Sequence, residues 1–107
     1  MSLYSLDLIA ALRAEGHPIA PGTAGENLTL SGLDWEDVLP GVRLRIGGVL
    51  IHVTAYASPC KSIRGSFLGG QMRRISQRIN PGWSRVYARV LEEGSLRVGD
   101  PAKVLRT

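Results

Sequence analysis

The fold is decided by one stretch of the chain, Val42-Arg43-Leu44-Arg45-Ile46-Gly47-Gly48-Val49-Leu50-Ile51-His52-Val53. Apolar side chains alternate with arginines before the two glycines, and the alternation resumes after them, which is the period of a strand with one buried face. Gly47-Gly48 makes a two-residue connection of the kind that favours a tight hairpin turn. The stretch therefore predicts an antiparallel β-hairpin over residues 42–53.

Further strands and two helices are expected around this hairpin. Strand patterns recur at 26–30, 86–91, 96–98 and 102–105, and 86–91 and 96–98 are expected to form a closing hairpin around 92–95. One helix begins after the cap residue Ser5 and ends at Gly16, and Asp34 caps a single turn. A second helix is expected over 67–79, ending at Asn80-Pro81-Gly82. The predicted fold class is mainly β (α+β), a β-barrel or partial barrel with two short-to-medium helices.

Length and composition bound the class of protein. The 107 residues suffice for one domain, taken as residues 1–107. A hydrophobic fraction of 44% with 21% charged residues is typical of a folded core rather than a disordered chain. No apolar stretch approaches the roughly 18 residues needed to cross a bilayer, and the first residues lack the basic segment of a secretory signal. We therefore expect a cytoplasmic protein without a membrane partner.

Charge is unevenly distributed along the chain. The net charge is +4, and residues 61–107 carry ten basic residues against three acidic ones. Most of these basic residues are arginines, whose forked side chains suit phosphate and carboxylate groups, so an anionic ligand is expected. One interpretation is a small basic β-barrel that binds nucleic acid. The aromatic residues are not interleaved with arginines as a base-stacking surface requires, which argues against nucleic acid as a partner.

Cys60 is the strongest candidate for a reactive or metal-binding residue. It is the only cysteine, so it can form neither an internal disulfide nor a CxxC pair. It follows Pro59 near the end of the second predicted strand, and Lys61 and Arg64 lie close by in sequence. Neighbouring cations lower the pKa of a thiol. A reactive, partly exposed thiolate and a buried structural cysteine both remain open on these local features.

The other candidates are weaker. His17 and His52, the only histidines, are expected to serve the loop and the strand in which they lie, and with one cysteine they make no zinc site. Residues 22–29 hold two glycines that allow a close approach of backbone to ligand, and Glu26 and Asn27 add an acceptor and an amide. The same pattern also fits an ordinary turn.

Several motifs in order along the chain resemble the MOSC domain, the family named for the C-terminal domain of molybdenum-cofactor sulfurase. Residues 17–29, His17-Pro18-Ile19-Ala20-Pro21-Gly22-Thr23-Ala24-Gly25-Glu26-Asn27-Leu28-Thr29, resemble its PGxxGENLT stretch. Ser58-Pro59-Cys60-Lys61 resembles its PC motif. Arg85-Val86-Tyr87-Ala88-Arg89-Val90, with Gly94 and Val98-Gly99-Asp100, resembles its closing strand pattern. The resemblance extends from Leu3 to Leu105.

This resemblance implies a function as well as a fold. The family binds molybdenum cofactor (molybdopterin) or carries sulfur for its maturation, and some members are molybdenum reductases of N-hydroxylated compounds. Cys60 takes the place of the family cysteine, as a metal-ligating thiolate or as a catalytic persulfide carrier. Asn27, Glu26 and Lys61 would bind the cofactor, with Asn27 and Cys60 on one cavity. The implied partners are molybdopterin or a sulfur-donor protein.

Family members usually carry an opening strand and a loop with the motif HGG ahead of the first helix. Met1 falls just before the helix in this chain, so the domain is expected to lack that strand and loop. Uncovered sheet edges favour association, and a homodimer is the simplest closed arrangement. A third interpretation is an interaction domain that has lost the activity. The sequence leaves open whether the protein is an enzyme.

Overall fold

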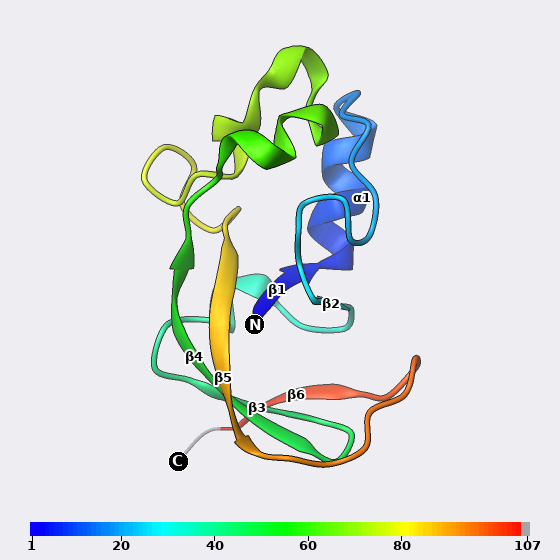
Figure 1. The fold of residues 1–107 in the computed structure, drawn as a ribbon, viewed down its shortest axis with the longest axis vertical. Helices are drawn as coiled ribbons and strands as arrows, with labels where there is room; N and C mark the ends of the chain where they lie inside the picture. Colours follow the sequence, from blue (N-terminus) through cyan, green and yellow to red (C-terminus); the bar gives the residue numbers. More distant parts are fainter. Residues whose placement is uncertain (106–107) are drawn as a thin grey trace.

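The computed structural model describes residues 1–105, and its main feature is one six-stranded sheet that curls into a half-barrel (Figure 1). The strands are β1 (Ser2–Ser5), β2 (Leu28–Leu30), β3 (Arg43–Ile46), β4 (Val49–Ala57), β5 (Arg85–Glu92) and β6 (Ala102–Leu105). Their order across the sheet is β2-β1-β5-β4-β3-β6, and all neighbours are antiparallel except β1 and β2. The predicted fold class is confirmed.

The predicted hairpin is β3 and β4. Leu44 pairs with Ile51, and Ile46 pairs with Val49, so that the apolar positions of both strands reach the buried face. β4 continues past the predicted end to Ala57 and pairs along its length with β5. That pairing has two register shifts, and such bulges bend a strand and increase its twist. The longest ladder of the sheet is therefore also the one that curls it.

The hairpin turn packs against a second pair of small residues. The Gly48 amide donates a hydrogen bond to the Ser95 carbonyl over 3.0 Å. A Cβ atom added at Gly94 would overlap the Gly48 carbonyl group. The crossing of these two segments therefore requires glycine at position 94, because no side chain fits between the backbones.

The strand β1 is absent from the sequence prediction, which placed Met1 directly before the helix. All four residues of β1 are buried, between β2 on one side and β5 on the other. Tyr4 pairs with Thr29 of β2, and Leu3 pairs with Val86 of β5. Four residues are too few to show a strand period, and the strand passes directly into a helix. The sequence analysis therefore missed this strand, and the absence of the family's opening strand and loop stays a prediction.

The first predicted helix is α1 (Leu6–Ala14). Ser5 caps it, as predicted, because its hydroxyl accepts a hydrogen bond from the Leu8 amide over 3.1 Å. Ile9 and Leu12 are buried, and the helix packs beside β1. Asp34 likewise caps a single turn, η1 (Trp35–Asp37). Among residues 1–105, no helix is both long enough and apolar enough to cross a membrane.

The second predicted helix is replaced by short 3₁₀ turns. The segment consists of η2 (Lys61–Ser66), η3 (Leu68–Gly70) and η4 (Met72–Ile75), not one helix over 67–79. Gly69 and Gly70 have φ angles of 61° and 72°. These left-handed conformations interrupt a right-handed helix. The apolar spacing that predicted the helix was correct about burial at Ile75, but two adjacent glycines prevent a continuous helix.

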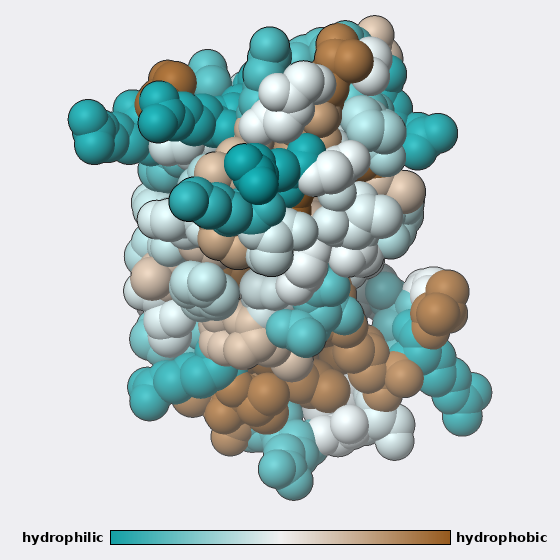
Figure 2. Space-filling view, turned by 45° about the horizontal axis from the view of Figure 1, so that its top comes forward, coloured by the Kyte–Doolittle hydropathy of each residue, from teal (hydrophilic) through white to brown (hydrophobic). Residues whose placement is uncertain are grey.

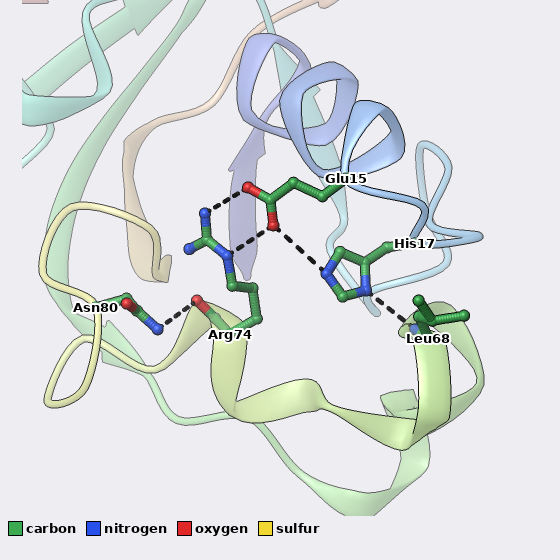
Figure 3. A network of polar contacts seen from close by, with 5 residues as sticks. All are labelled: Glu15, His17, Leu68, Arg74 and Asn80. Atoms are coloured by element: carbon green, nitrogen blue, oxygen red, sulfur yellow. Dashed lines mark hydrogen bonds and ion pairs between the residues drawn. The ribbon is translucent and has the colours of Figure 1, made fainter.

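Polar contacts fasten this segment to the end of α1 (Figure 3). The Arg74 guanidinium donates two hydrogen bonds to the Glu15 carboxylate, over 2.9 and 2.8 Å. Nδ1 of His17 accepts a hydrogen bond from the Leu68 amide over 3.0 Å. Asn80 donates to the Arg74 carbonyl over 3.2 Å. The 3₁₀ segment is therefore held in place by side chains from a distant part of the sequence.

The closing hairpin differs from the prediction. Residues 96–98 form no strand and therefore do not pair with β5, and the last predicted strand, β6, pairs with β3. The physical reason is a local turn: the Arg97 amide donates to the Asp100 carboxylate over 2.8 Å, so it is not free for a ladder. Leu96 and Val98 consequently lie exposed in the long connection from β5 to β6.

The sheet leaves edges and apolar side chains uncovered. β2 and β6 are its outer strands. Val90 and Leu91 near the end of β5 are exposed, as is Val98. Figure 2 shows apolar surface gathered in the lower part of the view, at the strand end of the molecule. Unpaired strand edges beside apolar surface are features that favour association with another chain.

We expect Gly94→Ala to destabilise the fold by about 1–3 kcal/mol, because the new methyl group would overlap the Gly48 backbone. Urea unfolding followed by circular dichroism measures the change. Gly65→Ala is the matched control, since a Cβ there meets no atom within 4 Å. Equal stabilities of the two variants would contradict the packing described above.

We expect the chain to self-associate through these uncovered edges, as the sequence also predicts. Sedimentation velocity at micromolar concentration tests this expectation. Replacing the exposed Val90 and Leu91 by lysine should weaken the association, because charges would replace apolar surface that a second chain could cover. A single species at the monomer mass of 11.6 kDa for the unaltered chain would refute it.

Candidate functional site

Cys60 lies where the prediction places it, just beyond the end of β4 and directly before η2. Its backbone is extended and its free thiol is exposed. The alternative of a buried structural cysteine is therefore wrong. The sulfur lies 2.8 Å from Oγ of Ser62, close enough for a hydrogen bond in either direction. When Cys60 is a thiolate, the Ser62 hydroxyl is the donor.

The surroundings of Cys60 lower the pKa of its thiol. The largest cause is the hydrogen bond from the Ser62 side chain, and the Ser62 backbone amide adds to it. Desolvation opposes these hydrogen bonds and raises the pKa, and the positive charge of Arg85 lowers it by less than desolvation raises it. The sequence analysis attributed this effect to Lys61 and Arg64. The cation that acts on the thiol is instead Arg85, which lies far away along the chain.

Arg85, the first residue of β5, joins two loops that carry the family-like motifs. We call residues 22–25 the glycine loop and residues 58–60 the cysteine loop. Nη1 of Arg85 donates to the Ala24 carbonyl over 2.8 Å, and Nη2 donates to the Ser58 carbonyl over 3.0 Å. The side chain is buried. The two loops are therefore brought together by one guanidinium group, which the sequence analysis did not single out.

Glu26 follows the glycine loop and is buried. One of its carboxylate oxygens accepts a hydrogen bond from the Thr29 hydroxyl over 3.1 Å. The other oxygen is buried without a hydrogen-bond partner among the residues that the structure describes. Buried carboxylate oxygens are normally paired, so this one is an acceptor available to a donor group not yet present.

Asn27 stabilises the sheet through hydrogen bonds to Ser2, the first residue of β1. Its side-chain oxygen accepts a hydrogen bond from the Ser2 backbone amide over 2.7 Å. The backbone amide of Asn27 donates to the Ser2 carbonyl over 2.9 Å. Asn27 also lines a cavity of about 390 Å³ between β2 and residues 96–100. Within residues 1–105, Cys60 does not contribute to that cavity. The Asn27 carboxamide is engaged by the start of β1, and the cavity shared by Asn27 and Cys60 stays a prediction.

The remaining candidates from the sequence are Lys61, His17 and His52, and they lie in different parts of the fold. Lys61 is exposed beside Cys60, as the first residue of η2. His17 accepts a backbone hydrogen bond in the network of Figure 3, and His52 lies on β4 beside Arg89 at 3.4 Å. Residues 1–105 contain no group of three or more His, Cys, Asp or Glu side chains that could hold a metal ion.

The fold and the order of these loops agree with one protein family. The sequence profile of the MOSC domain matches residues 1–103. The chain belongs to the MOSC domain family. The glycine loop and the cysteine loop, which Arg85 joins, both lie within the matched residues.

Known relatives of this MOSC domain are longer proteins. YflK of Bacillus subtilis (strain 168), described as uncharacterized, is 31% identical over 88 residues, which cover 82% of this chain and 39% of YflK. The crystal structure of YiiM from Geobacillus stearothermophilus is 29% identical with a TM-score of 0.77, over 99% of this chain and 54% of YiiM. YiiM from Escherichia coli, at 24% identity and a TM-score of 0.70 over 100% of this chain and 54% of that one, shares the fold. The chain thus spans about half the length of these solved relatives.

We expect Cys60 of the MOSC domain to react with iodoacetamide faster at neutral pH than the same cysteine in the urea-unfolded chain. The lowered pKa makes more of the thiol a thiolate, so the midpoint of the rate against pH should lie below that of the unfolded chain. Ser62→Ala should raise this midpoint, because it removes the largest cause of the shift. Identical profiles for folded and unfolded protein would contradict the geometry.

Proposed function

We propose that this MOSC domain handles molybdenum cofactor, or the sulfur destined for it, through the thiolate of Cys60. The observation that carries the proposal is an exposed thiol with a lowered pKa at the motif position where the family has its cysteine. Thiolates are soft ligands for metals and are also the nucleophiles of sulfur transfer. The proposal does not extend to the activities of the longer relatives as whole proteins.

As a sulfur carrier, the domain would need only a persulfide donor. The Cys60 thiolate attacks the terminal sulfur of the donor, a new S–S bond forms at Sγ, and the S–S bond of the donor breaks. The donor leaves as a thiolate, so no oxidant or reductant is consumed. The exposure of Cys60 gives a second protein access to the sulfur. The hydrogen bond from Ser62 lowers the pKa of the attacking thiol and so favours its thiolate form.

The donor set also fits the cofactor. Cys60 offers one soft thiolate to a molybdenum centre, and the exposed cations Lys61 and Arg64 lie next to it in η2, where they would face the anionic phosphate of a pterin. When bound, the cofactor supplies the redox chemistry. Glu26 offers its free oxygen to an N–H donor, but only if the glycine loop moves, since that oxygen is buried. Asn27 would act indirectly, by holding β1 beside β2.

Three finer points belong to the same proposal. Reduction of N-hydroxylated compounds, an activity of some family members, would need an electron donor as well, so we propose binding or sulfur transfer rather than that reaction. A homodimer remains the proposed assembly. The reducing cytoplasm is the proposed location, because a lone exposed thiol stays free there.

The test compares the unaltered protein with Cys60→Ser and Cys60→Ala after expression in cells that make the cofactor. Molybdenum and pterin are measured in the purified protein, and persulfide sulfur is measured by mass spectrometry after incubation with a low-molecular-weight persulfide. We expect stoichiometric cofactor or persulfide in the unaltered protein and its loss in both variants. Absence of both signals, or signals that survive Cys60→Ser, would overturn the proposal. Salt-dependent retention on nucleic acid in their place would favour the binding-module interpretation.

A further inference from the structure

We propose that a groove between η1 and residues 81–84 is a docking site for a short basic segment of a partner protein. The groove consists of two neighbouring cavities, of about 260 and 300 Å³, which share Trp35, Glu36, Pro81 and Gly82. The glycine loop and the cysteine loop are both described by the structure, and neither of them lines either cavity. The proposal therefore goes beyond the function proposed above and does not depend on it.

The first cavity is mainly apolar. Trp35 and Tyr56 form its aromatic walls, and Val38, Leu39 and Pro81 add aliphatic surface. Leu39 is 47% exposed and Pro81 is also exposed, so this apolar surface reaches the solvent. Concave apolar surface of this kind is typical of sites that receive an apolar group of a ligand or partner. The first cavity therefore suits an apolar side chain.

The second cavity combines aromatic walls with carboxylates. It is lined by Trp35 and Trp83 and by three exposed acidic residues, Asp7, Asp34 and Glu36. The described residues that line the two cavities include no lysine, arginine or histidine. None of the ion pairs within residues 1–105 involves any of these three acids. The complementary charge for this cavity is therefore a cation that the partner brings.

The aromatic walls select an organic cation. Guanidinium and ammonium groups stack on aromatic faces, and tryptophan is the best of these. Trp83 already has one such contact, because the guanidinium carbon of Arg74 lies 3.9 Å from its ring centroid. The charge of Arg74 is itself compensated by two hydrogen bonds to Glu15. A metal ion would need several oxygen ligands held together, and residues 1–105 contain no such group.

The walls of the groove are fixed by the core. The Trp35 indole N–H donates to the Ser84 carbonyl over 2.8 Å, which ties η1 to the segment before β5. The Tyr4 hydroxyl donates to the Trp83 carbonyl over 2.6 Å. The rings of Tyr4 and Trp35 also meet edge to face, with their centroids 6.1 Å apart. A groove whose walls are already ordered loses less conformational entropy when a partner binds.

The two cavities together favour a peptide segment over a small cation. A free amine or guanidinium fills only the acidic cavity and leaves the apolar one empty. An extended peptide presents alternate side chains to the same face, so an apolar residue and a basic residue two positions later can enter the two cavities together. We therefore expect the segment to carry an arginine or lysine two positions from an apolar residue.

The experiment follows tryptophan fluorescence, because both tryptophans of the chain, Trp35 and Trp83, line the second cavity. The probe is a tripeptide of leucine, serine and arginine, blocked at both ends and titrated into the whole chain. We expect a saturable change in emission with this peptide. The same peptide with citrulline, the uncharged isostere of arginine, should give none. Blocked arginine alone should bind about tenfold more weakly, because it leaves the apolar cavity empty.

Variants assign the binding to the groove. Asp34→Asn removes a charge but keeps a side chain that can cap η1, and Glu36→Gln removes a second charge. We expect each to raise the dissociation constant about two- to fivefold, and the double variant about tenfold. Glu93→Gln is the matched control, because Glu93 is exposed and lines neither cavity. It should leave the dissociation constant unchanged.

The proposal is overturned if the arginine and citrulline peptides bind equally, or if the folded double variant binds as the unaltered protein does. Blocked arginine that binds as tightly as the peptide would assign the groove to a small cation instead. Dissociation of an oligomer of this chain by the peptide, measured by sedimentation, would make a second copy the occupant and exclude a separate partner.

The outcome is independent of the proposed function. Cys60→Ser should bind the peptide as the unaltered protein does, since Cys60 lines neither cavity. Absence of molybdenum, pterin and persulfide from the unaltered protein would overturn the proposed function and leave peptide binding intact. Failure of peptide binding would leave those three measurements as they are.

Discussion

The arrangement of the site depends on β1, the strand of four buried residues that joins β2 to the rest of the sheet. β2 has no other neighbour, so the glycine loop that leads into it is placed by the parallel pairing of β1 with β2. Asn27 reinforces this pairing through two hydrogen bonds to Ser2. On its other side β1 pairs with β5, the strand that begins with Arg85. The short strand β1 thus sets the position of the glycine loop relative to Arg85, which also contacts the cysteine loop.

The chemistry of Cys60 combines a local interaction with one that the whole fold provides. Ser62 is two positions away and belongs to the same turn, so its hydroxyl is available wherever that turn forms. Arg85 reaches the site only when β4 and β5 pair, because its side chain must meet the Ser58 carbonyl beyond the end of β4. The exposed arginines and lysine nearby suit recognition of an anion in solvent. The buried arginine instead holds the glycine loop and the cysteine loop together through the Ala24 and Ser58 carbonyls.

Local patterns predicted the parts of the fold that local forces determine. The β3–β4 hairpin alternates clearly around two glycines, and Ser5 caps α1 through a contact three residues away. β1 has too few residues to show a period. The helix over 67–79 fails because Gly69 and Gly70 adopt left-handed angles that an apolar spacing does not reveal. Cys60 was identifiable as the one cysteine after a strand, whereas Arg85 gave no signal, because its partners are carbonyls on two distant loops.

The pairing of β1 with β5 also has a consequence for the order of folding. The amino group of Met1 donates to the Ala88 carbonyl over 3.0 Å, so β1 finds its place beside a strand that lies 87 residues further along the chain. Contacts so far apart in sequence carry a large loop-closure cost and slow the folding of a domain. The hairpin and α1 can form early, during synthesis. The strand that places the glycine loop must wait until β5 has been made.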